Sequence, residues 1–351
     1  MEGIRSKYII VGAGLAGLTT AYQLFQSGER DFIILESRDR IGGRVMTNDG
    51  IDFGATWFQT HHENVLDLLE ELKVEKFHQY NEGRSVLVYS TMAPEHYFEN
   101  DPNAPSAYRM VGSSMAMITA LAASFNNLII TNQVVTQIHE GKDLLAVYTD
   151  KRVFKAEKVL VTIPPGIATR IQYTPELPTE VTIAMEKTHT WMSNAIKVGL
   201  TFKTPFWRAK NLSGMVIGQV GSVTEMYDHC NTLDSGYALM GFVNETLRDF
   251  SAAERKARII NYLVKYLGKE VLQYKSYEEK DWSQDRNTSC ETIKSIYMSP
   301  SYGNPLFAEV YMNNRLLFAG AETSPVHGGY MDGAIYSGLL SAGKLLQQAK
   351  G

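Results

Sequence analysis

The feature that most constrains this chain is a glycine-rich turn near its start, placed between two apolar segments. Residues 7–11 read KYIIV and predict a buried strand, and residues 12–17 read GAGLAG. The apolar spacing of residues 15–27 predicts an amphipathic helix, and residues 31–35 predict a second buried strand. A strand, a glycine turn, a helix and a second strand in this order form the unit that binds a dinucleotide, whose phosphates face the helix N-terminus.

Each glycine of the turn has a separate physical role in such a unit. Gly12 makes the tight turn, Gly14 lets the backbone approach a pyrophosphate, and Gly17 lets the helix pack close to the strand. Glu36 ends the second strand 19 residues after Gly17, where a carboxylate accepts hydrogen bonds from a ribose. The unit therefore predicts a dinucleotide cofactor, without distinguishing NAD from FAD.

A second glycine pair, flanked by arginines, follows in the stretch ESRDRIGGR of residues 36–44. A loop of this kind suits a second wrap around a pyrophosphate. Through this stretch the chain resembles the flavin-containing amine oxidases, whose signature here reads E-x-R-D-R-x-G-G-R. In that family the loop holds FAD, so the resemblance implies FAD as the cofactor and Arg38, Gly43 and Arg44 as its contacts.

Composition excludes several classes of partner. The net charge of −4 and the lack of a concentrated basic run predict no nucleic-acid partner. No apolar run approaches the length of a membrane span, so we expect none. The first strand begins close to residue 1, without room for a signal peptide, and Cys230 and Cys290 have no metal-binding spacing. These features predict a reducing, cytoplasmic setting.

Two adjacent histidines come nearest to a metal motif. A capping box at Thr60 and Glu63 predicts a helix start, with His61 and His62 in the first turn. No third ligand is spaced to join them, so we expect solvated histidines and no metal site.

The order of predicted elements indicates two interleaved domains. Residues 84–90 alternate like a strand, whereas residues 91–106, with three prolines, read as a loop. Short strand patterns recur from 195 to 243 and precede an amphipathic helix at 251–267, which indicates a mostly antiparallel sheet backed by helices. A strand at 315–319 again runs into glycines and a helix.

We therefore predict an α/β fold with a Rossmann-like FAD-binding domain of the glutathione-reductase type, interleaved with a substrate lobe. The substrate lobe is a mostly antiparallel sheet backed by helices, and 351 residues are enough for both parts. The predicted segments are 1–78, 107–165 and 283–351 for the FAD-binding domain, and 79–106 and 166–282 for the substrate lobe.

The resemblance to the amine oxidases extends to the last predicted helix. Residues 320–323 read GAET and residues 328–334 read GGYMDGA, similar to the monoamine oxidase C-terminal region. In the family, this region and the one matching residues 51–58 lie against the flavin, and the backbone near 134 meets the adenine. The further cofactor contacts that the resemblance implies are Thr56, Trp57, Val134, Glu322, Tyr330 and Met331.

Lys197 is the first candidate for chemistry. It lies in NAIKV at residues 194–198, followed by KTPFWR at residues 203–208. Taken alone, a lysine in an alternating strand is more often a solvent-facing residue. The family carries a lysine in this context, held through a water to flavin N5. Such an ammonium would assist reoxidation, because the reduction of O2 develops negative charge.

Tyr330 and Glu291 are the candidates for contacts with the substrate. In the family, the tyrosine matching Tyr330 forms one wall of an aromatic cage beside the flavin. Where monoamine oxidases carry a second tyrosine, this chain has Glu291. Either another aromatic residue supplies that wall, with Trp57, Trp282 and Tyr297 as alternatives, or the carboxylate holds a cationic group of a diamine or polyamine.

Cys290 matches the cysteine that some members of the family link covalently to the flavin. Many members hold FAD without a bond, and a buried free cysteine is the alternative. Release of the flavin by acid distinguishes the two.

The resemblance implies an oxidoreductase that oxidises an amine to an imine, passes a hydride to flavin N5 and is reoxidised by O2 to hydrogen peroxide. The expected partners are therefore a small-molecule amine and O2. Alternatives on the same scaffold are a desaturase, an isomerase, and an amino-acid oxidase in which Arg208 or Arg170 holds the substrate carboxylate. A redox-silent FAD-binding protein is a further alternative. Because segment 79–106 is much shorter than in the animal enzymes, we expect a more open site.

Overall fold

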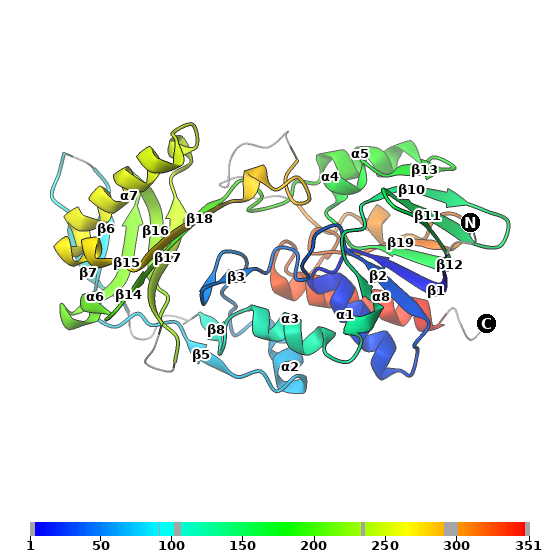
Figure 1. Ribbon diagram of the computed structural model, residues 1–351, viewed down its shortest axis with the longest axis horizontal. Helices are drawn as coiled ribbons and strands as arrows, with labels where there is room; N and C mark the ends of the chain where they lie inside the picture. The colour runs from blue at the N-terminus through cyan, green and yellow to red at the C-terminus, as the bar shows by residue number, and fades with distance from the viewer. Residues whose placement is uncertain (1–3, 91, 102–106, 233–235, 291–300, 348–351) are drawn as a thin grey trace.

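The computed structural model describes residues 4–90, 92–101, 107–232, 236–290 and 301–347. These residues form two lobes, each built on its own sheet, as Figure 1 shows. The first and last described elements of the chain lie in the same lobe, at the right of Figure 1.

The first lobe contains the dinucleotide unit predicted from the sequence. Strand β1 (Ile4–Val11) runs parallel to β2 (Phe32–Leu35), and helix α1 (Leu15–Gln26) connects them. Strand β1 also pairs in parallel with β12 (Val153–Val161), so the strand that carries the glycine turn lies inside the sheet. The last four residues of β1 are all buried, as expected for a parallel strand covered on both faces. The other strands of this eight-stranded sheet are β9 (Ile129–Ile130), β10 (Val135–Glu140), β11 (Leu145–Thr149), β13 (Gln172–Thr174) and β19 (Leu316–Phe318).

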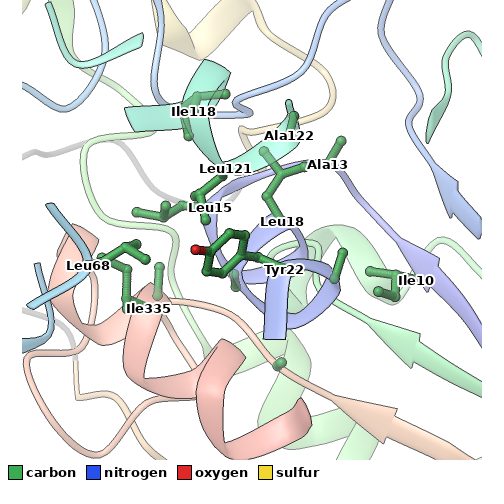
Figure 2. Packing of buried hydrophobic residues seen from close by; sticks show 14 of the residues in the cluster. Ile10, Ala13, Leu15, Leu18, Tyr22, Leu68, Ile118, Leu121, Ala122 and Ile335 are labelled. Atoms are coloured by element: carbon green, nitrogen blue, oxygen red, sulfur yellow. The ribbon is translucent and has the colours of Figure 1, made fainter. Parts of the chain in front are cut away.

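Helices cover both faces of the first sheet, and α1 is one of them. The others are α2 (Glu63–Glu71), α3 (Met115–Ala122), α4 (Pro165–Ala168), α5 (Thr179–Lys187) and α8 (Met331–Gln347). Figure 2 shows the core on the α1 side, where the Tyr22 ring of α1 points toward Leu68 of α2 and Ile335 of α8, and Leu18 points toward Ala122 of α3. This packing fixes the start of α1 at the end of β1, where the glycine turn lies.

The second lobe is built on a seven-stranded sheet, whose strands are β6 (Arg84–Val88), β7 (His96–Glu99), β14 (Ile196–Phe202), β15 (Leu212–Gly218), β16 (Val223–Asp228), β17 (Tyr237–Val243) and β18 (Ser276–Asp281). Their order is β18-β14-β17-β16-β15-β6-β7, and β15 with β6 is the one parallel pair among them. Helix α7 (Ala252–Leu267) packs on this sheet and begins with a capping box formed by Ser251 and Glu254. The predicted antiparallel sheet backed by a helix is thus confirmed, and the boundaries of the five segments stay a prediction.

The remaining β-strands and the remaining α-helix of the described residues are short. They are the strand pair β3 (Thr47–Asn48) and β4 (Ile51–Asp52), the strand pair β5 (Lys76–His78) and β8 (Tyr108–Met110), and the helix α6 (Phe206–Ala209).

Three local predictions were wrong. Strand β7 lies within the segment predicted as a loop, because it completes the edge of the second sheet beside β6. The predicted capping box before α2 is absent: α2 begins at Glu63 after His62, and no side chain caps it. His62 precedes the helix and is buried rather than solvated, because its ring packs against the rings of His61, His327 and Tyr330.

Candidate active site

A cavity of about 930 Å³ extends from the glycine turn after β1 to the second sheet. Its walls come from segments that follow β1, β2 and β19 in one lobe and from β14, β16 and β17 in the other. Gly17, Glu322 and Cys290 are described residues outside its lining, and Glu291 lies outside the described residues. The predicted site residues that line the cavity are Gly12, Gly14, Glu36, Arg38, Gly43, Arg44, Thr56, Trp57, Val134, Lys197, Tyr330 and Met331.

The glycine turn leaves open space at the start of α1. Gly12 has a φ of +108°, in the region that favours glycine, and Gly14 is the N-cap of α1 without a side-chain cap. A Cβ added at Gly14 would meet only the Gly43 Cα, at 4.0 Å. A helix N-terminus beside such a space fits the pyrophosphate of a dinucleotide.

Glu36 is buried at the carboxyl end of β2 and lines the same cavity. Its Oε2 accepts a hydrogen bond from the Ala13 backbone N–H at 2.8 Å, and its Oε1 accepts one from the Arg38 backbone N–H at 2.9 Å. The carboxylate is held in place by backbone donors, and its remaining acceptor capacity fits ribose hydroxyls.

Both predicted arginines are anchored by carboxylates. Arg44 pairs with Glu322 through Nη1–Oε1 at 2.7 Å and Nη2–Oε2 at 2.9 Å. Arg38 Nη2 donates to Asp285 Oδ1 at 2.7 Å and to Thr288 Oγ1 at 2.8 Å. Glu322 is buried and does not line the cavity, so it anchors Arg44.

Val134 lines the cavity, but both of its backbone groups have protein partners. Its N–H donates to Asp150 Oδ1 at 3.0 Å, and its carbonyl accepts from the Asp150 N–H at 3.0 Å. An adenine that used this backbone would therefore have to displace or share the bond to the Asp150 carboxylate.

Lys197 is buried in the cavity wall rather than exposed on its strand. Its side chain lies on β14, and its Nζ donates to the Gly54 carbonyl at 2.6 Å, to Thr56 Oγ1 at 3.0 Å and to the Asp52 carbonyl at 3.3 Å. The same nitrogen lies 5.3 Å from the centroid of the Trp57 ring and 5.0 Å from that of Phe242. The lysine of β14 is thus held by residues 52–56, which lie at and just after β4.

The pKa of Lys197 is lowered to about 7, first by its burial. The positive charge of Arg109 acts in the same direction, whereas the carboxylates of Asp52 and Glu225 act against the shift. At neutral pH, Lys197 therefore exchanges between an ammonium and a neutral amine.

Tyr330 is 44% exposed and opens α8 at the cavity. The Trp191 ring lies edge-on to it, with centroids 4.8 Å apart and an interplanar angle of 70°, and the His62 ring lies 5.4 Å away. The Trp191 backbone N–H donates to the Tyr302 hydroxyl at 2.8 Å. Tyr330 is therefore supported by neighbouring rings, and Trp191 joins the aromatic wall.

Two of the three aromatic residues considered for the second wall line the cavity, and the third, Tyr297, lies outside the described residues. Trp57 Nε1 donates to Gln79 Oε1 at 2.7 Å, and its ring packs edge-on against Tyr227. Trp282 is buried and donates through Nε1 to the Phe53 carbonyl at 2.7 Å.

The lining residues that the sequence analysis missed include Trp191, Glu225 and Phe242. Trp191 precedes Lys197 in the stretch TWMSNAIK, which was a usable signal. Phe242 is opposite Lys197 in the β14–β17 ladder and opposite Glu225 in the β16–β17 ladder, so the pairing of strands distant in the sequence brings these residues together.

Cys290 Sγ packs against Gly166 of α4, where an added Cβ would overlap the sulfur. Burial raises the pKa of the Cys290 thiol, which disfavours the thiolate that attacks a flavin.

We predict that acid precipitation releases all FAD into the supernatant, because the protonated Cys290 thiol packs away from the cavity. Absorbance of the supernatant and pellet near the flavin maximum measures this. Flavin that stays with the pellet in the wild type but not in Cys290→Ala would contradict the prediction.

Within the described residues, no helix has the length and apolar character needed to cross a membrane. Nor does any group of three or more His, Cys, Asp or Glu residues in those parts of the chain have the arrangement of a metal site.

The glycine turn after β1, the buried carboxylate of Glu36 after β2 and the cavity shared with an antiparallel lobe are typical of a two-lobed α/β protein of the dinucleotide-binding class. The family model described as flavin containing amine oxidoreductase matches residues 15–102 and 90–346. The chain belongs to this family, and FAD is the cofactor that membership implies.

Similar proteins agree with this assignment. The putrescine oxidase of Kocuria rosea is 25% identical over 402 residues, covering 81% of this chain and 84% of that protein. A probable flavin-containing monoamine oxidase A of Dictyostelium discoideum is 25% identical, covering 94% of this chain and 95% of that protein. The solved structure of cyclohexylamine oxidase from Brevibacterium oxydans has a TM-score of 0.86 at 17% identity, covering 99% of this chain and 100% of that chain. The predicted fold is therefore confirmed.

Proposed function

We propose that this protein is an FAD-dependent amine oxidase, which converts an amine to an imine and returns the electrons to O2 as hydrogen peroxide. The observation that carries the proposal is that Lys197 and Tyr330, from different lobes, line the same cavity as the glycine turn. FAD, when bound, supplies the hydride acceptor and the site that reacts with O2. Gly12, Gly14 and Glu36 would hold its pyrophosphate and ribose.

The chain's own residues would select and orient the amine. The Tyr330 ring favours an approaching amine through ring electrostatics. The substrate must react as a neutral amine, because an ammonium has no lone pair to assist C–H cleavage. The apolar walls formed by Trp282 and Phe242 favour that form through desolvation. The Lys197 ammonium would stabilise the negative charge that develops on O2.

An amino-acid oxidase is less well supported, because it needs a cation to hold the substrate carboxylate. Arg208 binds Asp228 through bonds of 2.7 and 3.0 Å and does not line the cavity. Arg170 lines it but is exposed, with Nη1 donating to the Arg286 carbonyl at 2.6 Å. A desaturase, an isomerase and a redox-silent FAD-binding protein stay as alternatives.

Anaerobic mixing of the purified yellow protein with panels of amines and amino acids tests the proposal. We expect amines to bleach the flavin absorbance and air to restore it with formation of hydrogen peroxide. Bleaching by amino acids alone would favour the amino-acid oxidase, and no bleaching by any compound would favour a redox-silent protein or another reaction.

We also propose a diamine as the substrate class, as the name of the similar putrescine oxidase suggests. Glu225 on β16 lines the cavity, and its Oε2 accepts a hydrogen bond from the Tyr227 hydroxyl at 2.9 Å. Glu36 and Asp150, the other carboxylates of the described lining, belong to the first lobe. Glu225 is therefore placed to hold a distal ammonium while the other amine reaches the flavin.

Glu225→Gln should raise the KM for a diamine about tenfold to a hundredfold, because it removes a charge-assisted hydrogen bond. The KM for a monoamine should change little. Steady-state kinetics with matched mono- and diamines measure both values, and Glu99→Gln, at an exposed carboxylate of the same sheet, is the control. If Glu291→Gln alone changes the preference, the cage-wall carboxylate holds the second amine instead.

A further inference from the structure

Hydrogen bonds through His229 and Asp52 link a buried arginine, Arg109, to Lys197, and this arginine forms no salt bridge among the described residues. Arg109 on β8 is 4% exposed, and its guanidinium donates to the carbonyls of Cys230 at 3.0 Å and His229 at 3.4 Å. Its Nε has no hydrogen-bond partner, and the group lies 5.1 Å from the centroid of the Phe77 ring. A cation that is not neutralised acts strongly on titratable groups in a buried region.

Asp52 on β4 provides the opposing charge. It is 1% exposed, and its Oδ1 accepts bonds from Thr47 Oγ1 at 2.6 Å, from Ser114 Oγ at 2.8 Å and from the Ser114 N–H at 3.2 Å. These donors are neutral, so they orient the carboxylate without cancelling its charge. The backbone carbonyl of the same residue contacts Lys197 Nζ.

His229 connects the two charges while remaining neutral. Its carbonyl accepts from Arg109, and its Nε2 accepts the Asp52 backbone N–H at 3.1 Å. Because that nitrogen is an acceptor, its approach to Asp52 Oδ2 at 3.7 Å is not an ion pair. Burial also holds the pKa of His229 well below its ordinary value.

We propose that Arg109 and Asp52 set the charge of Lys197, Arg109 favouring the neutral amine and Asp52 the ammonium. Arg109 is thus a positioning residue that acts through Lys197. The physical basis is that like charges disfavour, and opposite charges favour, a buried ammonium. The effect of Lys197 on O2 rests on the proposed function, whereas the charge setting does not depend on turnover.

The other groups around Lys197 do not replace this pair. Strand β16 brings Glu225, which favours the ammonium, and β17 brings the uncharged Phe242. Strand β18 brings Lys280, opposite Lys197 in the ladder, but its Nζ lies 3.4 Å from Asp285 Oδ2. Arg208 is neutralised by Asp228 at 2.7 Å.

The test is a carbon-13 NMR titration of the flavin-bound, full-length protein labelled at lysine Cε. The Lys197 signal is assigned by its loss in Lys197→Met. We expect Arg109→Gln to raise the titration midpoint by about one pH unit and Asp52→Asn to lower it by about as much, each a tenfold change in the ratio of ammonium to amine. The double variant should titrate near the wild type.

Opposite shifts of the Lys197 titration midpoint in the two variants indicate an electrostatic effect. A general disturbance of the fold would shift the midpoint of both variants in the same direction. Arg315→Gln is the control, because this arginine pairs with Glu140 before β19, at the opposite end of that strand from the cavity. If Arg109→Gln unfolds, Asp52→Asn alone decides. Equal midpoints in the wild type and the folded variants, or shifts of the same sign, would overturn the proposal whether or not the protein oxidises amines.

Discussion

Gly14→Ala should still fold, with only the small loss of stability expected for alanine at an N-cap, and yet bind FAD about tenfold to a hundredfold more weakly. The protein itself has room for the methyl group, since the added Cβ would meet only the Gly43 Cα at 4.0 Å. That space is where a pyrophosphate would approach the start of α1, and overpacking a close contact costs about 1–3 kcal/mol. Fluorescence titration of flavin-stripped protein measures the Kd, and thermal melting measures stability.

Gly17→Ala, in the same turn, is the comparison for Gly14→Ala. We expect it to reduce the stability of the fold rather than to block the cofactor directly. Its Cβ would overlap the Gly12 carbonyl oxygen and lie 2.8 Å from Thr162 Oγ1, so the fold itself must shift. We expect a loss of about 1–3 kcal/mol in the free energy of unfolding, seen as a lower Tm even without flavin. Unchanged FAD affinity in Gly14→Ala would show that the pyrophosphate does not lie against this turn.

Lys197→Met should slow reoxidation of the reduced flavin by O2 about a hundredfold or more, while substrate still reduces the flavin. A buried donor aimed at developing negative charge contributes about this much. Stopped-flow mixing measures the two half-reactions separately. Lys203→Met, at an exposed lysine just beyond β14, is the control. If only the reductive half-reaction slows in Lys197→Met, the lysine acts on the substrate instead.

The pH dependence of the two half-reactions should run in opposite directions. With a pKa of about 7, Lys197 loses its proton as the pH rises through that value, so reoxidation should slow above pH 7. Reduction should accelerate over the same range, because more of the substrate is the neutral amine. In Lys197→Met the reoxidation profile should become flat, and a profile that keeps the wild-type midpoint would assign the titration to another group.

The cofactor half of the site was readable from the sequence because its requirements are local. A tight turn, a helix start and a carboxylate at the next strand end lie within residues 7–36 and leave a contiguous pattern. The antiparallel lobe was readable for the same reason, since strand periodicity and turn residues recur over short spans. Lys197 was identified through a motif, although its strand periodicity alone favoured a solvent-facing side chain.

The tertiary structure decided the burial and the electrostatic environment of Lys197, on the side of the cavity formed by the second sheet. Lys197 is buried where residues 52–56, distant in the sequence, pack on β14 and supply its hydrogen-bond partners. Arg109 and Glu225 lie on strands distant in the sequence and shift the pKa of Lys197 in opposite directions. No residue periodicity predicts either interaction. The start of α2 shows the same limit, because the burial of His62 among distant rings prevailed over a local capping pattern. Residue patterns therefore predicted where a dinucleotide would bind, whereas long-range packing, which sets burial and charge, decided the environment of Lys197 in the cavity.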